Sequence, residues 1–143
     1  MDIRQLTPGF FVAPQIAPED MERLAALGIS LVICNRPDEE VPPSHQCEAM
    51  REAAERAGLA FAVQPLTHQT MTPPVIAANR ALIDGTDDTV LAYCASGTRS
   101  TVAWALGVAG DLDPDAIITA AQSAGYDLRN MKPTLEAIAA QQS

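Results

Sequence analysis

Cys94 is the side chain best placed to act as a nucleophile, and Arg99 follows it after a short loop, Ala95, Ser96, Gly97 and Thr98. The apolar run Val90–Tyr93 just before Cys94 predicts a buried strand, and the residues after Arg99 have helical character. Ligands of parallel sheets bind at the carboxyl ends of the strands, which is where Cys94 would lie. The N–H groups of the loop and the N-terminus of the helix would then converge on one anion.

A tetrahedral dianion is the ligand that such a site favours. The Arg99 guanidinium would bind the oxygens of the anion through charge-assisted hydrogen bonds. The same positive surroundings would favour the ionised, nucleophilic form of Cys94. Ser100 follows in the chain, and we expect its hydroxyl to donate to the Cys94 thiolate. The sequence therefore predicts Cys94, Arg99 and Ser100 as catalytic residues and residues 95–98 as an anion-binding loop.

The loop C-A-S-G-T-R-S resembles the signature of tyrosine and dual-specificity phosphatases, which has one more residue between Cys and Arg. Its shorter length is similar to the active loop of rhodanese-like sulfurtransferases, which bind thiosulfate and carry a persulfide on the cysteine. The whole chain resembles the beta-lactamase-hydrolase-like sulfurtransferase or phosphatase domains, a small bacterial family with a phosphatase-like fold. The stretches that carry this resemblance are Leu6–Ala13, Cys34–Glu40, Cys94–Ser100 and Ala124–Leu128.

Two reactions compete for Cys94. Hydrolysis of a phosphomonoester needs a general acid for the leaving alkoxide, and the resemblance to phosphatases implies an aspartate on a loop before the nucleophile. The corresponding loop, Pro65–Thr72, has no aspartate, and His68 is its only proton donor near neutral pH. Sulfur transfer releases sulfite or a thiolate, which need no proton. We therefore favour a sulfurtransferase, with a phosphatase as the alternative and a non-catalytic anion-binding or redox-sensing module as a further one.

The resemblance also implies the partners of the reaction. The sulfur donor would be a small anion, thiosulfate or a low-molecular-weight persulfide, and the acceptor would be a thiol or cyanide. Family members occur alone or fused to persulfide dioxygenases and sulfide:quinone oxidoreductases, so the resemblance implies that such an enzyme would act with this chain in trans. No cofactor is implied.

Several residues outside the loop have two interpretations each. Arg36 either adds positive charge at the rim of the anion site or pairs with one of the acidic residues that follow it. His68 either serves the substrate, as a donor or weak acid, or is an exposed loop residue. Cys34, which ends a predicted strand, either meets Cys94 as a resolving thiol or is a small core residue, and Cys47 is expected to be structural. Tyr126 fits both the family resemblance and an ordinary helix end.

Composition limits the possible functions. The chain has 143 residues and a formal net charge of −9, from 9 Lys+Arg and 18 Asp+Glu. We expect one domain over residues 1–143, and no binding to nucleic acid or to anionic membranes, which require clustered basic residues. No signal peptide or membrane-spanning run is present, so a cytoplasmic location is expected. The 3 cysteines form no CxxC motif and predict free thiols instead of a disulfide framework or a metal site.

Apolar strands alternate with helical patterns along the chain, which predicts an α/β fold with a mostly parallel central sheet flanked by helices. The resemblance specifies a protein tyrosine or dual-specificity phosphatase-like fold. The predicted strands are Ile3–Leu6 and Phe10–Ala13 in a hairpin, then Ile29–Cys34, Leu59–Val63 and Val90–Tyr93. The first two predicted helices start at Pro18 and span Ser44–Ala57, the second with Ser44 as its cap. The third starts after a Thr72 cap, and the fourth follows the Cys94 loop and places Trp104 in the core. The fifth starts after an Asp113 cap, and the last spans Pro133–Gln141.

Overall fold

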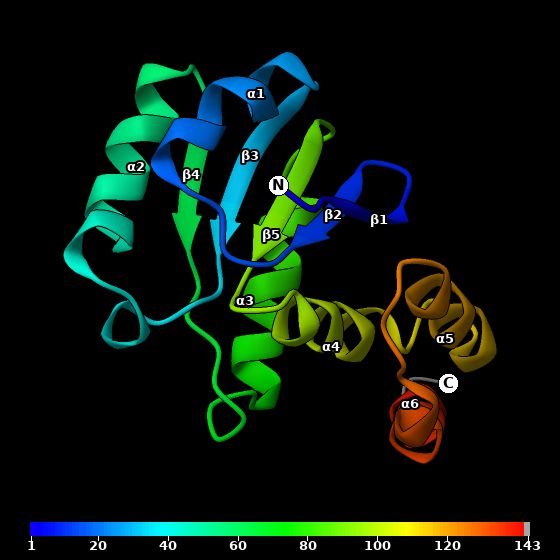
Figure 1. Ribbon diagram of the computed structural model, residues 1–143. Coiled ribbons are helices and arrows are strands. Elements are labelled where there is room, and N and C mark those ends of the chain that lie inside the picture. The colour runs from blue at the N-terminus through cyan, green and yellow to red at the C-terminus, as the bar shows by residue number, and fades with distance from the viewer. Residues whose placement is uncertain (142–143) are drawn as a thin grey trace.

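The computed structural model describes residues 1–141, and its centre is a five-stranded sheet in the order β1-β2-β5-β3-β4. An antiparallel hairpin of β1 (Arg4–Thr7) and β2 (Phe10–Ala13) opens the chain. The strands β2, β5 (Thr89–Tyr93), β3 (Ile29–Cys34) and β4 (Ala60–Val63) are parallel to one another. The predicted mostly parallel α/β sheet is therefore confirmed, and its carboxyl ends share one edge (Figure 1).

Helices cover both faces of the sheet (Figure 1). The helices α1 (Met21–Ala26) and α2 (Cys47–Arg56) pack on one face. The other face is covered by α3 (Pro73–Asp84), α4 (Thr98–Val108), α5 (Pro114–Ser123) and α6 (Lys132–Gln141). Within residues 1–141, none of these helices combines the length and the apolar stretch that crossing a membrane requires.

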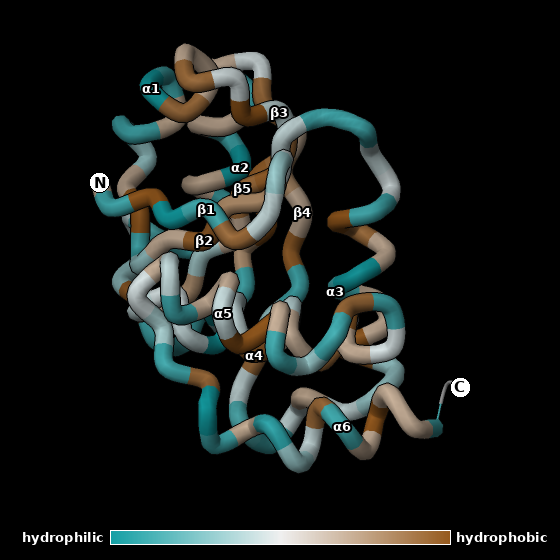
Figure 2. The backbone as a smooth tube through the Cα atoms, turned by 90° about the vertical axis from the view of Figure 1, so that its right-hand side faces the viewer, coloured by the Kyte–Doolittle hydropathy of each residue, from teal (hydrophilic) through white to brown (hydrophobic). Residues whose placement is uncertain are grey.

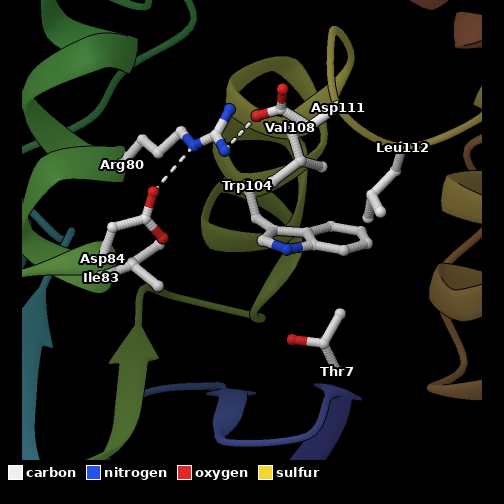
Figure 3. A pocket seen from close by; sticks show the side chains of 8 residues that line it. All are labelled: Thr7, Arg80, Ile83, Asp84, Trp104, Val108, Asp111 and Leu112. Atoms are coloured by element: carbon white, nitrogen blue, oxygen red, sulfur yellow. Dashed lines mark hydrogen bonds and ion pairs between the residues drawn. The ribbon is translucent and has the colours of Figure 1, made fainter. Parts of the chain in front are cut away.

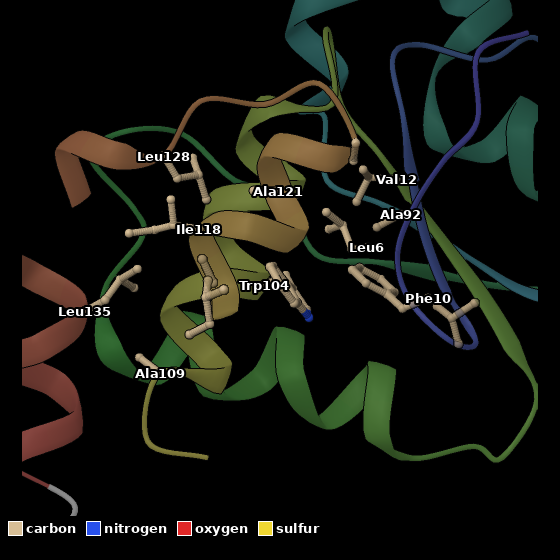
Figure 4. Packing of buried hydrophobic residues seen from close by; sticks show 14 of the residues in the cluster. Leu6, Phe10, Val12, Ala92, Trp104, Ala109, Ile118, Ala121, Leu128 and Leu135 are labelled. Atoms are coloured by element: carbon tan, nitrogen blue, oxygen red, sulfur yellow. The ribbon is translucent and has the colours of Figure 1, made fainter. Parts of the chain in front are cut away.

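The central strand β5 divides the core in two, because successive side chains of a strand point to opposite faces. Val90 and Ala92 face the cluster formed with α4, α5 and α6, whereas Leu91 and Tyr93 face α1 and α2. Trp104 lies in the first cluster with only 4% of its surface exposed, as predicted (Figure 4). Apolar segments accordingly concentrate in the strands and in α4, while polar segments follow the outer loops (Figure 2).

The start of α2 differs from the sequence prediction. The helix begins at Cys47, after a 3-10 turn at Pro43–His45, because Gln46 is extended. Ser44 therefore does not cap the helix, and its hydroxyl instead bonds to His45 Nδ1 at 2.8 Å. The cap comes from farther away, since the carboxylate of Asp38 accepts the Cys47 N–H at 2.8 Å. This contact ties the loop after β3 to the start of α2.

The sequence also predicted caps for α5 and α3, and the structure confirms them to different degrees. Asp113 caps α5 as expected, and its carboxylate accepts the N–H of Asp115 at 3.1 Å. Thr72 occupies the cap position of α3, but its hydroxyl makes no capping hydrogen bond. Its backbone carbonyl accepts the Ile76 N–H at 2.9 Å, so only the main chain of Thr72 contributes.

Candidate active site

Cys94 is fully buried and begins the short loop that joins β5 to α4. The loop turns back because Gly97 has a φ of +92°, in the left-handed region that glycine adopts without strain. In this conformation the Gly97 N–H donates to Cys94 Sγ at 3.1 Å. The Gly97 carbonyl in turn accepts the Thr101 hydroxyl at 2.7 Å, inside the first turn of α4. The loop therefore presents a backbone donor to the sulfur, as an anion-stabilising site requires.

Arg99 is held in place by a carboxylate. Its Nη1 donates to Glu40 Oε2 at 2.8 Å and to the Leu66 carbonyl at 2.9 Å, and its Nη2 donates to Glu40 Oε1 at 2.7 Å. Hydrogen bonding with Glu40 raises the pKa of Arg99, and Cys94 contributes to the rise. In the opposite direction, hydrogen bonding to Arg99, followed by Arg36, lowers the pKa of Glu40. Glu40 is therefore an ionised anchor for the guanidinium.

Arg36 belongs to the same ionic network. Its Nε lies 3.2 Å from Glu40 Oε1, and its Nη1 donates to Gln15 Oε1 at 3.2 Å. Of the two hypotheses for Arg36, pairing with a following acidic residue is the one present. The same acidic residue, Glu40, also holds Arg99. Gln15 also contacts the Cys94 loop directly, because its backbone N–H donates to the Ala95 carbonyl at 3.2 Å.

Ser100 makes a different hydrogen bond from the one predicted. It is fully buried on α4, and its hydroxyl donates to Asn35 Oδ1 at 2.8 Å instead of to Cys94. The side-chain amide of Asn35 donates to the Gln64 carbonyl at 2.8 Å and to Asn79 Oδ1 at 3.0 Å. Ser100 is thus part of a buried polar network that joins the ends of β3 and β4 to α3 and α4. Its place in the structure is that of a positioning residue for the loop.

A cavity of ≈ 450 Å³ opens beside the loop. Its walls include the predicted site residues Ala95, Ser96, Thr98, Arg99 and His68. The other lining residues are Glu40, Thr67 and Gln69, so the loop after β3 and the loop after β4 both reach the cavity. The structure therefore brings His68 to the same cavity as the anion-binding loop, while Cys94, Gly97 and Arg36 are not among its lining residues.

Tyr126 is a site residue that sequence reasoning left undecided. Its hydroxyl donates to the Ser96 carbonyl at 3.1 Å, although 30 residues separate the two in the chain. The phenol also covers Gly97, because a Cβ built there would overlap the hydroxyl oxygen and lie 2.9 Å from Cζ. Burial, followed by the nearby Cys94, raises the pKa of Tyr126. The Tyr126 hydroxyl thus stays protonated and can donate to the loop backbone at Ser96.

Cys34 contacts Cys47. The two sulfur atoms are 3.5 Å apart, and the Cys34 thiol donates to the Arg36 carbonyl at 3.3 Å. Cys34 pairs with Tyr93 in the β3–β5 register, and both side chains face the core under α1 and α2. Of the two interpretations of Cys34, the structure therefore supports the small core residue, and the thiol that it contacts is Cys47.

A second hollow, of ≈ 200 Å³, lies between α3 and α4 (Figure 3). Arg80 lines it and forms ion pairs with Asp84, at 3.0 Å, and with Asp111. Its other lining residues are Thr7, Ile83, Trp104, Val108 and Leu112, so no cysteine lines it. Its charged groups are already paired, so this hollow lacks the components of a reactive site. Among residues 1–141, no group of three or more His, Cys, Asp or Glu side chains is placed to hold a metal ion.

Comparison with known proteins assigns the family. The model of the beta-lactamase hydrolase-like protein, phosphatase-like domain, matches residues 2–111. The chain belongs to this family. Its relatives include beta-lactamase hydrolase-like proteins of Xylella fastidiosa, 30% identical over 130 residues, and of Agrobacterium fabrum, 31% identical over 117 residues. The matched regions cover 90% and 80% of this chain but only 30% and 27% of those longer proteins.

Solved structures place the fold among phosphatases. A crystal structure of a candidate phosphatase from Neisseria meningitidis has a TM-score of 0.85 and 34% identity, and it covers 96% of this chain and 99% of that one. More distant folds include P. aeruginosa TpbA in complex with phosphotyrosine, with a TM-score of 0.69 at 12% identity, covering 99% of this chain and 90% of that one. The kinase associated phosphatase is similar, with a TM-score of 0.66 at 12% identity, covering 99% and 94%. The predicted family and the phosphatase-like fold are both confirmed.

Proposed function

We propose that this phosphatase-like domain is a sulfurtransferase that carries sulfur as a persulfide on Cys94. The observation that supports it best is the state of Glu40. This is the one carboxyl group among the described residues lining the cavity, and its pKa is lowered by Arg99 and Arg36. An ionised carboxylate that already accepts hydrogen bonds from Arg99 cannot protonate a leaving alkoxide. The site is therefore better suited to a leaving group that departs as a stable anion.

Sulfur transfer meets this condition in both half-reactions. The Cys94 thiolate attacks the outer sulfur of thiosulfate, a new S–S bond forms, and sulfite leaves with the electron pair of the old S–S bond. An acceptor thiolate or cyanide then attacks the outer sulfur of the Cys94 persulfide, and the Cys94 thiolate leaves and is regenerated. No net proton transfer to a leaving group is needed in either step.

The residues around Cys94 have distinct parts in this reaction. The Gly97 N–H, which donates to Cys94 Sγ at 3.1 Å, stabilises the negative sulfur before and after each step. Arg99 binds the sulfonate of the donor, and Glu40 fixes the direction of the guanidinium. Ala95, Ser96, Thr98 and His68 line the space in which the donor would lie.

A phosphatase is the second candidate, and the comparisons favour it. The family is named for its phosphatase-like domain, and the Neisseria meningitidis relative is described as a candidate phosphatase. In that reaction the Cys94 thiolate attacks phosphorus, and His68, on the wall of the same cavity, would protonate the leaving alkoxide. The two candidates thus share the nucleophile and differ in their need for His68.

The partners of the proposed reaction follow from its chemistry. The donor is a small anion, thiosulfate or a low-molecular-weight persulfide, and the acceptor is a thiol. A persulfide dioxygenase or a sulfide:quinone oxidoreductase would consume or supply such persulfides in trans. Free thiols are maintained in the reducing cytoplasm, where we place the reaction.

Parallel assays distinguish the candidates. Thiocyanate formation from thiosulfate and cyanide, and phosphate release from p-nitrophenyl phosphate, are measured for the wild type, Cys94→Ser and His68→Gln. We expect thiocyanate formation that Cys94→Ser abolishes and that His68→Gln changes much less than the ~100-fold or more typical of a lost general acid. Phosphate release that needs both Cys94 and His68, without thiocyanate formation, would replace the sulfurtransferase by the phosphatase.

A further inference from the structure

A second pair of thiols lies outside the proposed reaction. Cys34, the last residue of β3, is 2% exposed, and Cys47, the first residue of α2, is half-buried. Their sulfur atoms are 3.5 Å apart. A disulfide bond is about 2.05 Å long, so an approach of about 1.5 Å would join them.

The two thiols stand at the two ends of one functional loop. Residues 35–46 connect β3 to α2 and carry Glu40, which holds the Arg99 guanidinium, and Arg36, which bonds to Glu40. Two hydrogen bonds already connect residues of this loop with Cys34 and Cys47. The Cys34 thiol donates to the Arg36 carbonyl at 3.3 Å, and the carboxylate of Asp38 accepts the Cys47 N–H at 2.8 Å. A bond between the two sulfurs would therefore close the loop at its base without crossing the anion site.

We propose that Cys34 and Cys47 are a redox-active dithiol, and that a low-molecular-weight disulfide converts them into a disulfide that closes the loop holding Arg99. The Cys47 thiolate attacks one sulfur of the small disulfide RSSR, and one thiolate RS⁻ leaves. The Cys34 thiolate then attacks Cys47 Sγ in the mixed disulfide, and the second RS⁻ leaves. The protein dithiol loses two electrons and two protons, and RSSR is reduced to two RSH.

The accessibility of the two thiols sets the order of these steps. Cys47 is half-buried and reaches the small disulfide first, while the buried Cys34 is the resolving thiol. Burial, followed by the proximity of Cys34, raises the pKa of Cys47. The thiolate of Cys47 is therefore not stabilised, in contrast to strongly oxidising dithiols, whose reduced form is stabilised. A disulfide formed here should consequently be slow to form and resistant to reduction.

The test removes the catalytic cysteine, so that its outcome is independent of the proposed function. Cys94→Ser protein is incubated with oxidised glutathione, and its intact mass and its non-reduced peptides are measured. We expect the loss of two hydrogen atoms and a peptide pair linked through Cys34 and Cys47. The matched control, Cys94→Ser with Cys47→Ser, should lose no hydrogens. A stable glutathione adduct on Cys47 without the internal link, or an unmodified protein, would overturn the proposal.

Hydrogen exchange measures the effect on the loop. In the oxidised Cys94→Ser protein, amides of residues 35–46 should exchange at least several-fold more slowly than in the reduced protein, because closure of the loop suppresses its opening. Amides of α5, on the other face of the sheet, serve as the internal reference. Unchanged exchange in residues 35–46 of the fully oxidised protein would refute the closing of the loop.

Discussion

Replacing Gly97 by alanine adds one Cβ atom and so tests both the backbone conformation of the Cys94 loop and its contact with Tyr126. Gly97 has a φ of +92°, and a left-handed conformation costs a residue with a Cβ roughly 1–2 kcal/mol. The new Cβ would also overlap the Tyr126 hydroxyl and lie 2.9 Å from Tyr126 Cζ, so the ring must move. Moving it breaks the hydrogen bond from Tyr126 to the Ser96 carbonyl, which contributes about 0.5–1.5 kcal/mol. Gly97→Ala should thus lower the free energy of unfolding by about 1.5–3.5 kcal/mol.

Urea unfolding followed by circular dichroism measures this loss in three backgrounds. In Tyr126→Ala the obstacle is absent, and Gly97→Ala should cost only the roughly 1–2 kcal/mol of backbone strain. In Tyr126→Phe the ring carbon still lies 2.9 Å from the new Cβ, so a cost above that of strain alone should persist. An equal cost of Gly97→Ala in the wild type and in Tyr126→Ala would show that the tyrosine does not contact the loop. A negligible cost in every background would refute the left-handed conformation of Gly97.

Three further predictions concern the residues that support the loop. Arg99→Ala removes a charge-assisted hydrogen bond to the anion, worth about 1.5–3 kcal/mol, so KM for thiosulfate should rise roughly 10- to 100-fold in steady-state assays; an unchanged KM would place the anion elsewhere. Ser100→Ala leaves the buried Asn35 Oδ1 without its donor and should cost about 1–3 kcal/mol in urea unfolding, whereas a neutral result would contradict the buried network. Because the pKa of Glu40 is lowered from 4.5, its ion pair stabilises the fold above pH 4.5 and is lost as the pH falls through the lowered value. Wild-type stability should therefore fall more steeply than that of Glu40→Gln below pH 4.5, and identical slopes in pH-dependent unfolding would argue against the pair.

Much of the fold could be predicted from local patterns in the sequence. The buried strands β3 and β5 are apolar runs that end at Cys34 and Tyr93, and Asp113 with Pro114 predicts the start of α5. The position of Cys94 at the carboxyl end of a parallel strand follows from the same patterns. These features depend on residues that are close in the chain, where periodicity and capping are informative.

The partners of the site side chains depend on tertiary contacts and were not predictable in this way. Glu40 is 59 residues before Arg99, and two other acidic residues adjoin it, so no local rule selects it as the anchor. Ser100 faces Asn35 because of the rotational phase of α4, which composition alone does not determine. The contact of Cys34 with Cys47 arises because α2 starts at Cys47, after the extended Gln46, and not at Ser44.

Intact-protein mass spectrometry after incubation with thiosulfate tests the central proposal most directly. The reduced wild-type chain is exposed to thiosulfate, freed of excess reagent and digested to locate any added sulfur. A persulfide on Cys94 is expected, with the mass of one extra sulfur atom that cyanide then removes. An unmodified Cys94, or an added sulfur that remains when Cys94 is replaced by serine, would contradict the assignment of Cys94 as the sulfur carrier.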